Sequence, residues 1–152
     1  MSVDLAQLYS AKLLALTTQI PHQGRLDAPQ ASVRERAPLC GSTVTVDLDM
    51  EDGRVARFAQ DVKACALGQA SAAVLGSVVI GRTLEELETA RDQLAAFLKE
   101  DGPVPDAPFE GYEVLLPARD YKNRHASILL SVTAAAAAAR IAQENDGALT
   151  VK

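Results

Sequence analysis

Residues 43–62 read TVTVDLDMEDGRVARFAQDV, and they carry the pattern from which the predicted fold is built. Over residues 43–50, valine, leucine and methionine alternate with threonine and aspartate, the period of two expected of a strand with one buried face. Glu51-Asp52-Gly53 is predicted to be a short turn, with a positive φ at Gly53. A second strand is expected over residues 54–62, where imperfect alternation indicates a bulge or a strong twist. The stretch therefore predicts an antiparallel hairpin.

Helical patterns follow the hairpin. Residues 66–80 are rich in alanine, serine, glycine and valine and predict a closely packed helix that ends near Gly81. Thr83 and Glu86 have the spacing of a capping box, which starts a further helix through about residue 99.

The C-terminal part begins with a Pro/Gly-rich loop at residues 101–111, and residues 112–122 show no clear pattern. The alanine run within residues 124–144 predicts a strong helix there, ended by Asn145 and Gly147.

The N-terminal part starts with an expected helix over residues 3–18, whose apolar stripe contains Leu5, Tyr9, Leu13 and Leu16. Residues 20–39 are polar and interrupted by proline and glycine, which predicts a long connection. The whole chain, residues 1–152, is expected to be a single domain. Its fold class is predicted as α+β, with a small antiparallel β-sheet packed against several helices on one face.

Composition and charge limit the classes of partner and the location that are expected for the protein. The 152 residues are 48% hydrophobic and 23% charged with a net charge of −5, which is ordinary for a soluble globular domain. No Lys/Arg cluster suggests a nucleic-acid partner, and no apolar run reaches the ~20 residues of a membrane span. The N-terminus lacks the features of a signal peptide, so a cytoplasmic location is expected.

Catalysis is not expected. A phosphate-binding glycine loop is missing, and a cysteine–histidine nucleophile pair would have no recognisable orienting group or oxyanion hole. The protein is therefore predicted not to be an enzyme.

Cys40 and Cys65 are the two cysteines. Cys40 precedes the first predicted strand and Cys65 follows the second, so antiparallel pairing should bring them close together. His125 is expected near the start of the last helix.

The residues alone leave the role of these groups open. Free cysteines are often inert core residues, and a lone histidine is usually an ordinary polar residue. The acidic side chains of the hairpin are expected to form a solvated face and turn rather than a metal site: Asp47, Asp49, Glu51 and Asp52.

Several motifs in the same order resemble the NifU/IscU/SufU-type family of iron–sulfur cluster assembly scaffolds. They are PLCGS at 38–42, EDGRVARF at 51–58, ALGQASAAVLGSVVIGRTLEEL from residue 66 and RHASIL at 124–129. Tyr9-Ser10 and GRLDAP at 24–29 also match the family pattern.

The resemblance implies a site of three cysteines and an aspartate that binds a nascent cluster or zinc, with a histidine beside the third cysteine. Cys40 and Cys65 match the first two thiols, and His125 matches the histidine. Ser42 stands at the aspartate position and Ala126 at the third cysteine position. The implied metal and cofactor ligands are thus Cys40, Cys65 and His125, fewer than the four protein ligands that a cluster usually takes.

Two functions follow as expectations. The first is a scaffold or carrier that transiently binds iron or an iron–sulfur cluster, receives sulfur from a cysteine desulfurase and delivers to apo-acceptor proteins. The alternative is a zinc-binding or metal-free paralogue that docks and regulates a desulfurase or another partner. A Cys/Cys/His set with an open fourth position is a known zinc arrangement.

Overall fold

The sheet has three antiparallel strands in the order β1 (Ala31–Arg36), β2 (Thr43–Glu51) and β3 (Arg54–Lys63). The structure is a computed structural model that describes residues 9–150, with side chains over residues 9–145. β2 and β3 form the predicted hairpin, which turns through Asp52 and Gly53 at φ of 55° and 76°. Their register shifts between Asp49 and Met50, so the predicted irregularity is confirmed as a bulge.

The first strand was not expected. β1 lies within residues 20–39, so the prediction of one long connection there is wrong. Its pattern is hard to recognise because Arg34 and Arg36 are exposed and Val33 is only partly buried. Charged residues are typical of edge strands, where they discourage pairing with other chains. Because of β1, Cys40 lies in a short connection between two paired strands.

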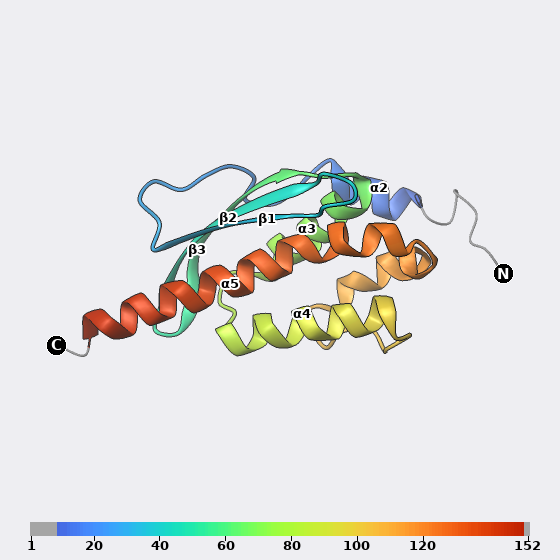
Figure 1. Cartoon of the computed structure of the whole chain (residues 1–152). Coiled ribbons are helices and arrows are strands. Elements are labelled where there is room, and N and C mark those ends of the chain that lie inside the picture. The colour runs from blue at the N-terminus through green and yellow to red at the C-terminus, as the bar shows by residue number, and fades with distance from the viewer. Residues whose placement is uncertain (1–8, 151–152) are drawn as a thin grey trace.

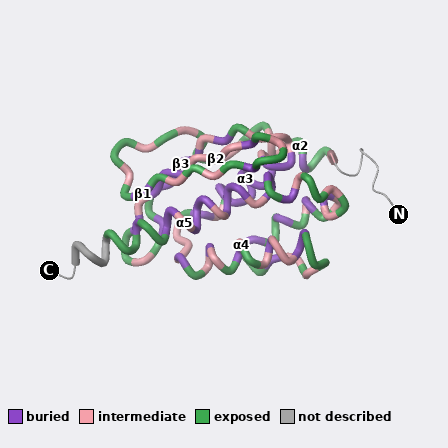
Figure 2. Tube along the Cα trace, viewed as in Figure 1, coloured by how far each residue is buried: buried purple, intermediate pink, exposed green. Residues whose placement is uncertain are grey.

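The helices form layers on one face of the sheet. Figure 1 shows α5 between the sheet and α4, and Figure 2 shows that the buried residues concentrate where these layers meet. The helical elements are α2 (Ala11–Thr17), α3 (Ala66–Val78), α4 (Leu84–Lys99) and α5 (His125–Thr150), with 3₁₀ segments η1 (Glu110–Asp120) and η2 (Lys122–Arg124). The α+β class, with helices packed on a small antiparallel sheet, is confirmed.

The central helix α5 is long and apolar. Within the described residues, the segment Lys122–Asn145 has the length and composition of a membrane span, yet 67% of its most apolar window is buried inside the protein. Alanines dominate its buried surface, which allows the sheet and α4 to approach closely. Its composition is therefore explained by its place in the core.

Helix boundaries differ from the predictions in three places. Ser10 caps α2 by accepting a hydrogen bond from Leu13 N at 3.1 Å, so the helix starts after it; the predicted residues 3–8, with Leu5, lie outside the described residues. The predicted loop at residues 101–111 ends earlier than expected, since residues 110–120 form a 3₁₀ helix that contains Pro117. The predicted stop at Asn145 is wrong, since a glycine after it costs only about 1 kcal/mol relative to alanine and does not end a helix by itself.

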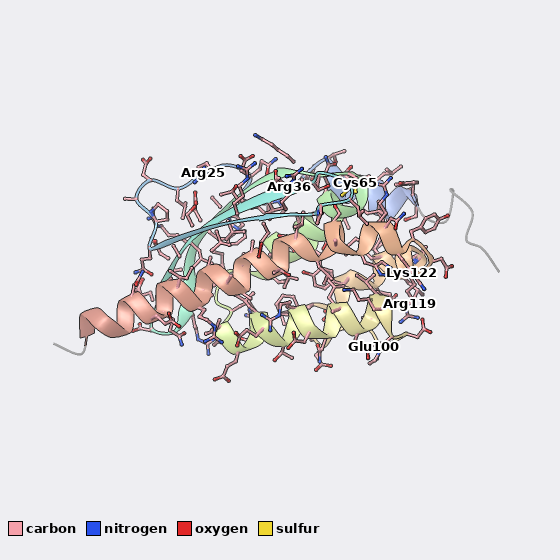
Figure 3. The ribbon with its side chains drawn as sticks, viewed as in Figure 1. Arg25, Arg36, Cys65, Glu100, Arg119 and Lys122 are labelled. Carbon is pink, nitrogen blue, oxygen red and sulfur yellow. The ribbon has the colours of Figure 1, made fainter. Side chains whose placement is uncertain are left out.

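The second face of the sheet carries an ion pair. Asp47 has a fully buried side chain that accepts hydrogen bonds from Arg25 Nε at 2.7 Å, Leu26 N at 3.0 Å and Ser32 Oγ at 2.6 Å. The prediction of a solvated carboxylate is therefore wrong for Asp47. Figure 3 shows Arg25 on the loop that crosses above the sheet, so this pair holds the N-terminal segment against β2.

Candidate functional site

Cys40 lies in the tight connection between β1 and β2. Gly41 N donates to Ala37 O, and Ala37 N donates to Ser42 O, both at 2.9 Å. Gly41 adopts a φ of +71°, which glycine takes without strain. This turn leaves the Cys40 thiol half-buried and Ser42 buried beneath it.

Cys65 is the N-cap residue of α3. Its carbonyl accepts the helical hydrogen bond from Gln69 N at 2.9 Å, while its side chain makes no capping bond. The thiol is thus available to face α5, where it lies 3.5 Å from Ser127 Oγ. Gly68 permits this close approach, because a Cβ there would lie 2.6 Å from Ser127 Oγ.

Two serine hydroxyls connect the two thiols. Ser127 Oγ donates to Ser42 Oγ at 3.1 Å, and Ser42 Oγ lies 3.2 Å from Cys40 Sγ. Each hydroxyl has one proton to donate. When Ser127 donates to Ser42, Ser42 is free to donate to the Cys40 sulfur, and the Cys65 thiol can donate to Ser127. The two cysteines therefore lie near each other at the same end of the sheet. Their thiols are linked by the row Cys40–Ser42–Ser127–Cys65.

The Cys40 thiol is biased toward its thiolate. Burial alone would raise its pKa, but the hydroxyls of Ser42 and Ser127 and the positive charge of Arg124 together hold the pKa of Cys40 below its usual value. Since the thiolate is the form that binds metals and attacks sulfur, this lowered pKa favours the reactive form of Cys40.

His125 faces a different direction. It is 5% exposed, and its Nε2 lies 3.1 Å from both Ala118 O and Arg119 O. Carbonyl oxygens only accept, so Nε2 carries the proton and ties the start of α5 to η1. Within the described part of the chain, no three His, Cys, Asp or Glu side chains gather closely enough to hold a metal ion. The role of Cys40, Cys65 and His125 as one ligand set stays a prediction.

The two positions that depart from the family pattern have different surroundings. Ser42 is 4% exposed and lies inside the row of hydroxyls. Ala126 is exposed and lines a cavity of about 600 Å³ together with His125, Arg119 and Lys122. At the aspartate position, Ser42 thus supplies a buried hydrogen-bonding hydroxyl. At the third cysteine position, Ala126 leaves open space in the cavity.

Sequence reasoning did not identify the connecting role of the serines. Ser127 lies in the RHASIL motif and Ser42 in PLCGS, where the family pattern marks Ser42 only as the replacement of a ligand. The sequence does hold a signal for this role. Ser42 lies two residues after Cys40 and Ser127 two residues after His125, on segments expected to meet at the cysteine end of the hairpin.

The protein is a three-stranded α+β domain with two cysteine thiols at one end of its sheet, which is the arrangement expected of the NifU/IscU/SufU-type class. The chain belongs to the NifU-like N terminal domain family, whose model matches residues 8–127.

Solved structures agree with this assignment. A nitrogen-fixing NifU-like protein (N-terminal) from Brucella abortus is 45% identical to this chain, with 92% of this chain and 97% of that chain covered and a TM-score of 0.89. Two further crystal structures share the fold at a TM-score of 0.78 with 90% of this chain and 99% of theirs covered: a hypothetical protein at 20% identity, and a protein described as a scaffold for iron–sulfur cluster assembly in the SUF system of Fervidobacterium islandicum at 17% identity. None of the curated proteins compared with the chain matches it.

Proposed function

We propose that this chain is a scaffold or carrier in iron–sulfur cluster assembly, and that its cargo is held by Cys40 and Cys65. The observation that carries the proposal is the row of hydrogen bonds from Cys40 through Ser42 and Ser127 to Cys65. It keeps two thiols from different elements at one place and favours the thiolate of Cys40. Proteins of the NifU/SufU type are scaffolds and not enzymes, so no turnover is required of this site.

Two thiols leave the cargo incompletely bound. A cluster usually takes four protein ligands, mainly thiolates. The carbonyls of Ala118 and Arg119 occupy Nε2 of His125, so this residue could serve as a third ligand only through Nδ1, and the protein would still supply fewer than four ligands. We therefore propose that the remaining ligands come from outside the chain, which suits a carrier that must release its cargo.

The partners follow from this chemistry. A cysteine desulfurase would supply sulfur to the reactive Cys40 thiolate, and apo-acceptor proteins would receive the cluster. Both thiols are free, so we propose a reducing compartment, the cytoplasm, as the place of action.

A second candidate function is favoured by one observation. No group of three metal-ligating side chains exists among residues 9–145, so a metal-free paralogue that binds and regulates a desulfurase is the alternative. Such a protein would use the same family fold for docking without carrying iron.

Anaerobic purification without metal-binding tags separates the two functions. Iron, zinc and acid-labile sulfide are measured per chain with a visible absorption spectrum, in the wild type and in Cys40→Ala and Cys65→Ala. A scaffold is expected to hold iron and sulfide after reconstitution, to lose both in either variant, and to pass a cluster to an apo-acceptor. His125→Gln tests the third ligand, because cargo retained in that variant assigns the site to the thiols.

The opposite results overturn the scaffold proposal. Zinc alone, or no metal after reconstitution, together with an altered desulfurase turnover, would assign the chain to the regulatory function. Cargo that survives loss of both thiols would place the site elsewhere on the molecule.

A further inference from the structure

A cavity of about 750 Å³ opens beside Cys40. One wall is formed by Cys40 and by Leu39, which is 77% exposed, and the other by residues 120–124 at the entry to α5. Its volume lies within the range of small-molecule sites, about 300–1,000 Å³. The cavity is therefore large enough to hold a molecule of the size of a short peptide in contact with Cys40.

The lining is positively charged, although the chain as a whole carries −5. Lys122 and Arg124 both line the cavity, and neither side chain forms an ion pair within the part of the chain that the structure describes. Asp120 is the one carboxylate in the lining. Arg124 is close enough to Cys40 to lower the pKa of its thiol. The cations thus remain available to an anionic ligand.

Figure 3 shows how these elements meet. Arg36, Cys65 and Lys122 all lie toward the end of the molecule where α5 begins, which is also the end where the thiols are joined through Ser127. Cargo held on the thiol pair would therefore have the cavity with Lys122 and Arg124 on its Cys40 side.

We propose that this cavity seats a small thiol that bears carboxylate groups, and that the thiol supplies an outside ligand to iron held on the cysteine pair. The inference rests on the proposed function and names the source of a ligand that the chain lacks. The carboxylates would pair with Lys122 and Arg124, and the sulfur would reach the space next to Cys40.

The binding step involves no redox change. The small thiol gives its proton to solvent and its sulfur forms a bond to iron, while the Cys40–iron bond stays intact. A soft thiolate suits this place better than a carboxylate or water, because the irons of clusters are held mainly by thiolates. Release of the small thiol would free the same coordination position for the thiolate of an acceptor protein.

Binding of the small molecule in the cavity, here called the seat, is tested first on the metal-free protein. S-methylglutathione carries the carboxylates but cannot ligate iron through a thiolate or exchange with disulfides. It is titrated into ¹⁵N-labelled protein, and saturable shifts are expected at residues 39–41 and 120–124. Lys122→Gln with Arg124→Gln should weaken this binding about tenfold or more, since both charge-assisted contacts are lost.

A matched variant controls for loss of positive charge. Arg57→Gln with Arg91→Gln removes the same charge from residues outside the cavity lining and should leave the binding constant unchanged. No saturable shift in the wild type, or equal weakening in both double variants, overturns the seat.

The ligand role is tested by anaerobic reconstitution with iron and sulfide, with and without glutathione. Glutathione is expected to raise cluster yield several-fold in the wild type and in the control variant but not in Lys122→Gln with Arg124→Gln. Full cluster yield without any added thiol overturns this inference and leaves the scaffold function standing. Binding of S-methylglutathione without a cluster under any condition refutes the scaffold function, while the anion seat itself is retained.

Discussion

Ser127 donates a hydrogen bond to Ser42 across 3.1 Å, although 85 residues separate them in the chain. Ser127 lies in the first turns of α5, and Ser42 ends the connection that carries Cys40. Both side chains are buried, at 1% and 4% exposure. This contact joins the helix layer to the sheet between the two thiols, so we expect it to affect both the geometry of the pair and the reactivity of Cys40.

Replacing Ser127 with alanine should make Cys40 less acidic. The variant removes the hydroxyl that donates to Ser42, and Ser42 is the group that donates to the Cys40 thiolate, so the pKa of Cys40 should rise toward its usual value and less thiolate should be present at neutral pH. Measured as the rate of iodoacetamide alkylation against pH in a Cys65→Ala background, the profile should shift to higher pH, and the rate at pH 7 should fall several-fold.

Ser131→Ala is the matched control for this experiment. Ser131 is also a buried serine of α5, but it donates to Gln60 Oε1 at 2.8 Å, away from the thiols. Both variants should lose about 1 kcal/mol of unfolding free energy, because each removes a buried hydrogen bond. Equal alkylation profiles in the two variants would show that Ser127 has no particular effect on Cys40.

Gly68→Ala should disturb the site through packing. The added Cβ would lie 2.6 Å from Ser127 Oγ and 2.9 Å from Ala64 Cβ, so α3 and α5 must separate locally. We expect a loss of about 1–3 kcal/mol in unfolding free energy and a changed alkylation rate of Cys65 in a Cys40→Ala background. Gly76→Ala offers a comparison in the same helix, since its Cβ would meet Gln60 Nε2 at 2.9 Å and should cost stability without changing Cys65.

Asp47 should make stability depend on pH. Burial opposes its charge, but hydrogen bonds from Arg25, Ser32 and the Leu26 amide outweigh this and lower the pKa of Asp47 below its usual value. Its contribution is fully present above the unfolded-state pKa of about 4 and is lost as the pH falls through the lower folded-state value. Asp47→Asn should therefore cost about 2 kcal/mol at pH 7, and the cost should shrink in acid.

Urea unfolding of the wild type and Asp47→Asn at a series of pH values from neutral to strongly acidic checks this prediction. Asp92→Asn provides the control, because Asp92 is 71% exposed and, among the described residues, its ion pair is with its neighbour Arg91. Its effect should stay below about 0.5 kcal/mol. A cost for Asp47→Asn that is constant over the acid range would exclude the linkage described here.

Much of the fold could be predicted because its determinants are local. The alternation at residues 43–50 and the Asp52-Gly53 turn define the hairpin without help from the rest of the chain, and the alanine run defines α5. β1 was not predicted because its burial depends on partners: Ala31 is buried only because the strand lies beside β2 and α5. Tertiary pairing of this kind leaves a weak trace in the sequence.

The site was predictable to the same degree. Antiparallel pairing alone places Cys40 and Cys65 at one end of the hairpin, and the structure joins them through serines. The direction of His125 could not be foreseen, since it depends on the carbonyls of a 3₁₀ segment that had no recognisable pattern. Likewise, the cavity beside Cys40 arises from the fold of residues 120–124, which no motif describes.

Restoring the two lost family ligands should restore metal affinity. Ser42→Asp would place a carboxylate beside Cys40, and Ala126→Cys would add a thiol at the exposed start of α5 next to His125. In the metal-free protein the new carboxylate should raise the pKa of Cys40, because two like charges would share the site. Bound iron would reverse this penalty, since each anion is then paired with the cation.

Anaerobic titration with ferrous iron measures the outcome in both single variants and the double variant. The double variant should bind iron at least about tenfold more tightly than the wild type, with a smaller gain for each single change, because ligands to one ion act together. Ser77→Asp with Ala137→Cys introduces the same groups further along α3 and α5 and should leave affinity unchanged. Unchanged affinity in Ser42→Asp with Ala126→Cys would mean that the geometry of the family pocket has not been kept in this chain, and that the serine bridge has replaced the metal site rather than preserved it.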